Sequence, residues 1–192
     1  MNNIFDLNEY KFSKEENYLF DANVWLNVFA PFTFETKKVH DIYSKMFRDI
    51  LESNCNIYTT NIIVSEVVNR ISQNQYKLCR NKYFEKGDPT LGNFDHKTFR
   101  ETDFYKDEIA YDISNQIQNI ASYSKLCDVS TGNNDFLYDV AEIFEKCTLD
   151  FNDIIYLKTC EENSLALITH DRDFKDCEIK IITANKAMLE SN

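Results

Sequence analysis

Glycine and proline are scarce in this chain, with 3 Gly and 2 Pro among 192 residues. Tight turns and linkers depend on these two residue types, so we expect helices joined by short polar loops and exclude an all-β fold. The sequence also lacks a secretory leader and any apolar run of about 18 residues, the length that crosses a bilayer. We therefore expect a cytoplasmic protein that has no membrane partner.

Cysteine motifs are missing as well. The six cysteines are scattered, without a C-x-x-C pair and without histidines at zinc-finger spacing. This pattern excludes a zinc finger and favours reduced thiols in the protein interior.

Basic residues are also few, since the chain has 21 Lys and Arg against 32 Asp and Glu, which gives a net charge of −11. Nucleic-acid-binding proteins usually show the opposite balance. A phosphate backbone, however, responds to the local field rather than to the total charge, and a bound cation neutralises clustered carboxylates. The charge therefore leaves both a nucleic-acid enzyme and a binding module open.

Aromatic residues are plentiful, with 15 Phe and 11 Tyr, and predict an aromatic-rich core. Short apolar segments that read as strands alternate with segments of helical periodicity. We predict strands at residues 17–21, 56–60, 126–129, 164–171 and 178–183. We predict helices at 35–52, 61–84 with Asn61 as its cap, 97–125 as one long or broken helix, 134–146, 152–162 and after 183.

This alternation predicts an α/β fold of three layers, α/β/α, around a central, mostly parallel sheet of about five strands. We expect one domain over residues 1–192, in which a loop and a helical segment at about 84–125 enlarge the middle.

Four acidic residues lie at strand ends or in first helical turns, the positions that form the binding sites of such folds. Asp21 and Asp171 end predicted strands, while Glu66 and Asp153 fall in the first turns of predicted helices. Each acid alone is better explained as a helix cap, a turn residue or a solvated residue, so the prediction depends on the set. The carboxyl edge of a parallel sheet nevertheless collects strand ends and helix starts in one crevice.

Carboxylates in one crevice need compensation, because two of them about 5 Å apart repel by about 3 kcal/mol at an effective dielectric constant near 20. Oxygen-only ligands suit Mg²⁺ or Mn²⁺, which can activate water to attack a phosphodiester. Asp150 and Asp173 are candidate auxiliary ligands. Asn23 and Thr169 could orient Asp21 and Asp171, but we interpret them as ordinary turn residues.

One segment is distinctly basic. The helix that carries Glu66 continues with Arg70, Lys77, Arg80, Lys82 and Lys86. We consider the first four a candidate track for RNA phosphates, although a solvated helical face explains them as well.

Three local motifs resemble PIN domains. YLFDANVWL at 18–26 resembles their opening strand and turn, TTNIIVSEVVNR at 59–70 their second strand and helix, and the segment at 150–174 their closing signature. The resemblance implies Asp21, Glu66, Asp153 and Asp171 as catalytic residues and as ligands of Mg²⁺ or Mn²⁺. It also implies ribonuclease activity like that of VapC-type toxins, an antitoxin partner and a homodimer.

Two other functions stay open. The first is a non-catalytic PIN-like module that binds a protein or RNA partner, which the acidic charge favours. The second is a phosphatase with an aspartyl nucleophile, but Asn23 stands where the D-x-D motif of such enzymes requires an acid.

Overall fold

A computed structural model describes residues 3–30, 36–85, 94–129, 134–146 and 149–190 of the chain. Its centre is a six-stranded parallel sheet in the order β1-β6-β5-β2-β3-β4. The strands are β1 (Ile4–Asp6), β2 (Asn17–Phe20), β3 (Asn56–Thr59), β4 (Lys125–Leu126), β5 (Leu165–Ile168) and β6 (Ile181–Thr183).

The order of the strands reverses beside β2. From β2 the chain moves to β3 and β4 on one side, whereas β5 and β6 lie on the other side of β2. Tyr18 of β2 pairs with Ile57 of β3 and with Ala166 of β5, so β2 occupies the middle of the sheet. In open α/β sheets, a crevice forms at such a reversal, beyond the carboxyl ends of the strands.

Helices flank the sheet, and together they give the three-layer α/β/α architecture that the alternation predicted. They are α1 (Ala22–Phe29), α2 (Lys37–Glu52), α3 (Asn61–Glu85), α4 (His96–Glu101), the π-helix η2 (Tyr105–Ile109), α5 (Ala110–Tyr123), α6 (Asp135–Lys146), α7 (Phe151–Asn163), the 3₁₀ helix η3 (Arg172–Asp176) and α8 (Lys186–Leu189). None of these helices is both long and apolar enough to cross a bilayer.

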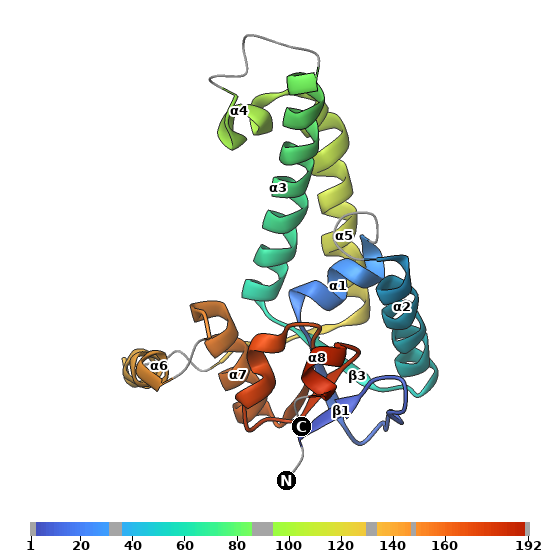
Figure 1. Cartoon of the computed structure of the whole chain (residues 1–192), viewed down its shortest axis with the longest axis vertical. Helices are drawn as coiled ribbons and strands as arrows, with labels where there is room; N and C mark the ends of the chain where they lie inside the picture. The colour runs from blue at the N-terminus through green and yellow to red at the C-terminus, as the bar shows by residue number, and fades with distance from the viewer. Residues whose placement is uncertain (1–2, 31–35, 86–93, 130–133, 147–148, 191–192) are drawn as a thin grey trace.

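Helices α3 and α5 run side by side away from the sheet, with α4 at the far end (Figure 1). We call α3, α4, η2 and α5 the arm. Phe99 of α4 is fully buried within it, 5.8 Å from the Tyr76 ring and 5.3 Å from the Tyr105 ring between centroids. Ser72 also contacts His96, through Oγ and Nε2 at 2.9 Å. The arm therefore has a small aromatic core of its own.

Aromatic side chains also dominate the main core, as their number predicted. Trp25 is 1% exposed, and its ring lies 4.9 Å from Phe20 and 5.7 Å from Phe29 between centroids. Phe29 in turn lies 5.9 Å from Tyr123, which joins α1 to the base of α5. Aromatic packing thus connects the central strand to the arm.

The structure differs from the sequence-based prediction in several places. Strand β1 was missed, because Ile4–Asp6 is too short to show periodicity. The predicted strand at 126–129 is only Lys125–Leu126 at the edge of the sheet. The segment at 97–125, predicted as one long or broken helix, is the broken one, because the helix is interrupted after α4, where Thr102 is extended. Finally, Thr60 and not Asn61 caps α3, because its Oγ1 accepts from the Ile63 N–H at 3.0 Å.

Candidate functional site

The ends of β2 and β5 carry two of the four predicted acids at the reversal of strand order. Asp21 directly follows β2, and its backbone N–H donates to the carbonyl of Ile168, the last residue of β5, at 3.1 Å. Thr169 is the first residue after β5, and Asp171 lies two residues further along the chain. Neighbouring parallel strands therefore bring the two carboxylates to one edge, as their positions in the sequence predicted.

A hydrogen-bond network holds Asp21 in place. Thr169 Oγ1 donates to Asp21 Oδ2 at 2.6 Å, and the side-chain amide of Asn23 donates to the same oxygen. Thr169 Oγ1 also accepts from the Asp171 N–H at 2.9 Å, while Asn23 Oδ1 accepts from the His170 N–H at 3.0 Å. The interpretation of Asn23 and Thr169 as ordinary turn residues was therefore incomplete, since both orient Asp21.

The side chain of Asp21 is 4% exposed, and its carboxyl group is hard to ionise. Burial raises its pKa from 3.8 to about 6, and the negative charges of Glu66 and Asp171 act in the same direction. The hydrogen bond from Thr169 and the charge of Arg70 oppose this rise. A buried carboxylate near two other acids, with its Oδ1 atom outside the network above, is a position that a cation would stabilise.

Asp153 enters the same field from α7. Its backbone N–H is capped by Asp150 Oδ1 at 3.0 Å, so Asp150 begins the helix. Burial raises the pKa of the Asp153 carboxyl from 3.8 to about 7, and the charges of Asp150, Asp21 and Asp171 add to the rise. The fold therefore brings Asp153 within electrostatic range of the two acids at the strand ends, although about 130 residues separate it from Asp21 in sequence.

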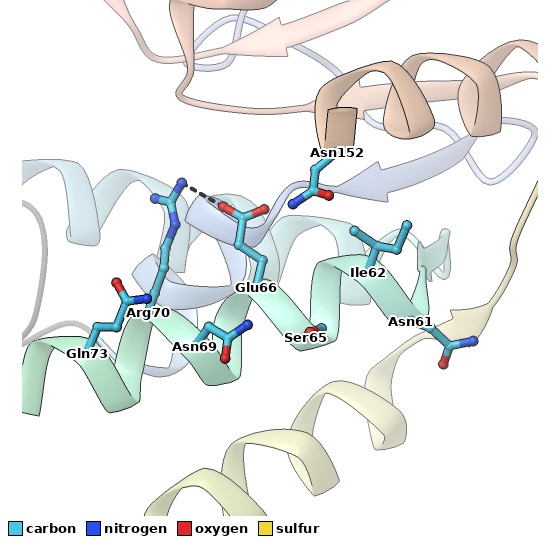
Figure 2. A pocket seen from close by; sticks show the side chains of 8 residues that line it. All are labelled: Asn61, Ile62, Ser65, Glu66, Asn69, Arg70, Gln73 and Asn152. Carbon is cyan, nitrogen blue, oxygen red and sulfur yellow. Dashed lines mark ion pairs between the residues drawn. The ribbon is translucent and has the colours of Figure 1, made fainter. Parts of the chain in front are cut away.

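Glu66 of α3 is already engaged by two neighbours. Arg70 Nη2 lies 2.6 Å from its Oε1 atom, and the hydroxyl of Tyr156 on α7 donates to its Oε2 atom at 2.7 Å. Figure 2 shows the ion pair and the approach of α7 to this side of α3. Tyr156 was missed at the sequence level because it lies in an apolar run. The signal was its hydroxyl, which needs a partner when the ring is buried.

The donor set fits a hard divalent cation in chemistry, because every candidate ligand atom is a carboxylate oxygen. No side-chain hydrogen bond engages the Asp153 carboxylate within the described part of the chain. In the same residues, no three acidic, His or Cys side chains are yet grouped closely enough to hold a metal ion. A cation held by three or more of these carboxylates would therefore need their side chains to move closer together.

The remaining predicted residues lie around this centre. Asp173 is exposed in the first turn of η3, where its N–H donates to Asp171 Oδ1 at 3.0 Å. Lys77, Arg80 and Lys82 are exposed on the arm, and Lys86 falls outside the described residues. Seven residues make almost two helical turns, so Lys77 projects on the side of Arg70, whereas Lys82 projects elsewhere. The structure therefore does not align all four cations in one track.

Comparisons with known proteins point to one family. The model of the PIN domain family matches residues 18–180. A chain of VapBC2 from Rickettsia felis, solved bound to a DNA fragment from their promoter, has a TM-score of 0.54 and 12% identity, covering 87% of this chain and 98% of that chain. PAE2754 from Pyrobaculum aerophilum has a TM-score of 0.49 and 17% identity, covering 93% and 97%. Among curated proteins, none matches the sequence.

The Rickettsia structure supports the fold alone at this identity. The family match carries more, because its residues 18–180 include most of the sheet and all four of the acids described above. It extends over well more than half of the 192 residues. The chain therefore belongs to the PIN domain family.

Proposed function

We propose that this protein is a metal-dependent ribonuclease in which Asp21, Glu66, Asp153 and Asp171 hold Mg²⁺ or Mn²⁺. PIN domains are generally nucleases that use divalent metal ions. The observation that carries the proposal is the mutual field of the acids. The negative charges of Glu66 and Asp171 help to raise the pKa of Asp21, and those of Asp21 and Asp171 help to raise the pKa of Asp153, in addition to burial. Repelling carboxylates in one crevice have a clear use if they bind a cation.

The residues of this chain divide the work as follows. Asp21, fixed by Thr169 and Asn23, and Asp171, whose N–H is fixed by Thr169, form the rigid part of the ligand set. Asp153 and Glu66 complete it from α7 and α3. A bound Mg²⁺ or Mn²⁺ supplies Lewis-acid activation of water and of the phosphodiester. Hydrolysis then leaves a 3′-hydroxyl and a 5′-phosphate. Asp150 and Asp173 are auxiliary ligands in this proposal.

The partners of the proposed enzyme follow from its family. RNA is the substrate in this proposal, and Arg70 and Lys77, the exposed cations that project on the same side of α3, contact its phosphates. The VapBC2 likeness adds a proposed role as the toxin of a type II toxin–antitoxin pair, with an antitoxin as protein partner. We also propose a homodimer, which the family resemblance implies. We place the protein in the cytoplasm, where such RNA is found.

Cleavage of RNA by the purified protein with Mn²⁺ or Mg²⁺ tests the enzyme proposal. Asp21→Asn should abolish the activity, because it removes a charged ligand while keeping the side-chain shape. Asp6→Asn is the matched control, since Asp6 also ends a strand but β6 and β5 separate β1 from β2. The proposal is wrong if the parent protein cleaves no RNA with either ion, or if Asp21→Asn cleaves as fast as the parent.

One observation favours a second function, a non-catalytic module that binds protein or RNA. Both carboxylate oxygens of Glu66 are engaged, by Arg70 and by Tyr156, and a structural ion pair of this kind suits a scaffold. Calorimetric titration with Mn²⁺ separates the two functions. A nuclease should show a site that disappears in Asp21→Asn, whereas a scaffold should show no heat that depends on Asp21.

A further inference from the structure

A row of neutral polar side chains follows one side of α3 and lines a pocket of about 420 Å³. Asn61, Ser65, Asn69 and Gln73 succeed one another at intervals of four residues, so they neighbour one another on the helix surface. Asn152 of α7 lines the same pocket, with its amide toward Glu66. We call these five residues the amide pocket. Its volume is in the range of pockets that hold small ligands.

Most side chains of the amide pocket make no hydrogen bond within the described part of the protein. Asn61 is occupied, because its Nδ2 atom donates to Asp128 at 2.8 Å. The side chains of Ser65, Asn69, Gln73 and Asn152 have no hydrogen-bond partner anywhere in the described part of the protein. Each amide offers two donors and an acceptor in one plane. Ser65, Asn69 and Gln73 are exposed to solvent, so the pocket presents donors and acceptors that no protein group occupies and that a ligand can take over from water.

The amide pocket adjoins the proposed catalytic centre. Glu66 and Arg70 line it, and Asn152 directly precedes Asp153 in the first turn of α7 (Figure 2). Figure 2 shows the amide of Asn152 pointing toward Glu66, with Asn69 next to the ion pair and Gln73 beyond it along α3. If the phosphodiester of an RNA strand lies at the acids, the neighbouring nucleotide would therefore lie beside these amides.

The chemistry of the lining distinguishes between the parts of a nucleotide. A phosphate would meet Arg70, but this guanidinium is already paired with Glu66 at 2.6 Å, and the other lining groups are neutral. A base edge instead presents donors and acceptors in a plane, which side-chain amides match in pairs. The side chain of Ile62 adds apolar surface for a base face. Single-stranded RNA exposes both the edges and the faces of its bases.

We infer that the amide pocket binds one unpaired base of single-stranded RNA next to the cleaved phosphodiester and determines base preference. This inference rests on the proposed function for the position of the cut, but base binding itself does not require cleavage. Asn69 on α3 and Asn152 on α7 are the residues that read the base edge.

Fluorescence anisotropy with labelled single-stranded RNA hexamers of A, C or U tests the inference on the full chain in EDTA, where a metal-dependent enzyme does not cleave. The parent should prefer one of the three hexamers. Asn69→Ala and Asn152→Ala should each weaken that preferred complex roughly five- to tenfold, the size of a lost base contact, and leave the others within about twofold. Asn81→Ala is the matched control, an exposed amide of α3 outside the pocket.

Several results would overturn the inference. They are equal binding of the three hexamers by the parent, an equal loss for all hexamers in the two variants, or an abasic hexamer that binds as tightly as RNA. The last result would assign the pocket to phosphate. Failure of the nuclease is a separate outcome, because RNA that stays intact with Mn²⁺ while base preference disappears in Asn69→Ala refutes the catalytic proposal alone.

Discussion

Replacing Asp21 with Asn should make the metal-free protein more stable at pH 8, although the same change should abolish catalysis. The Asp21 side chain is 4% exposed, and its pKa rises from 3.8 to about 6, first because of burial. A rise of about 2 in pKa corresponds to about 3 kcal/mol, at 1.36 kcal/mol for each unit. Asparagine carries no charge, and its oxygen can still accept from Thr169 and Asn23.

The sign follows from proton binding. Between about pH 4 and pH 6 the folded protein holds a proton on Asp21 that the unfolded chain has lost, so the stability of the parent falls as the pH rises through this window. The variant has no such proton. Its advantage should therefore be small at pH 4 and should approach about 3 kcal/mol at pH 8, an upper value that Asn desolvation reduces.

Urea unfolding in EDTA at pH 4, 5, 6 and 8 measures this difference. The single tryptophan, Trp25, is 1% exposed and reports unfolding of the core by its fluorescence. Asn81→Ala, a neutral and exposed change on α3, should differ from the parent by the same amount at every pH. A constant difference between parent and Asp21→Asn, or a variant that is less stable at pH 8, would refute the buried-charge reasoning.

Three further predictions concern the same centre. Mn²⁺ affinity measured by calorimetry should rise from pH 5 to pH 8 with release of protons, because the pKa values of Asp21 and Asp153 are about 6 and about 7; affinity that is flat with pH would contradict this. Thr169→Val should destabilise the fold by about 1–3 kcal/mol in urea unfolding and raise the pKa of Asp21, because it removes the donor that lowers this pKa. Tyr156→Phe should cost about 1 kcal/mol of stability through the lost hydrogen bond to Glu66, and an unchanged unfolding midpoint would speak against that bond.

The sequence predicted the fold class and most helices because apolar periodicity is a local property. The segment at 35–52 shows it clearly, with Val39, Tyr43 and Met46 at helical spacing, and the helix is present as α2. Strand β1 is different, because three residues have no period and its pairing partner β6 lies at the other end of the chain. The prediction that residues 1–192 form one domain, enlarged at about 84–125, stays a prediction.

The candidate site was predictable only in part. Asp21 and Asp171 follow from the rule that strand ends meet at one edge of a parallel sheet. The partners of Glu66 could not be predicted in this way, because Tyr156 lies 90 residues away and reaches Glu66 through the packing of α7 beside α3. The amide pocket was missed as well, because Asn69 and Gln73 have no charge and look like ordinary solvated helix residues. Only the geometry assembles these side chains.

The arm should unfold locally while the sheet stays intact. Its aromatic contacts join residues close in sequence, such as Tyr76 with Phe99, whereas the sheet depends on strands from both ends of the chain. Local contacts of this kind allow a segment to unfold and refold without separating the strands. Amide protons of α4 and of the distal turns of α3 should therefore exchange with solvent earlier than those of β2 and β5. For the same reason, insertions at the far end of the arm should be tolerated without displacing the acids near the sheet.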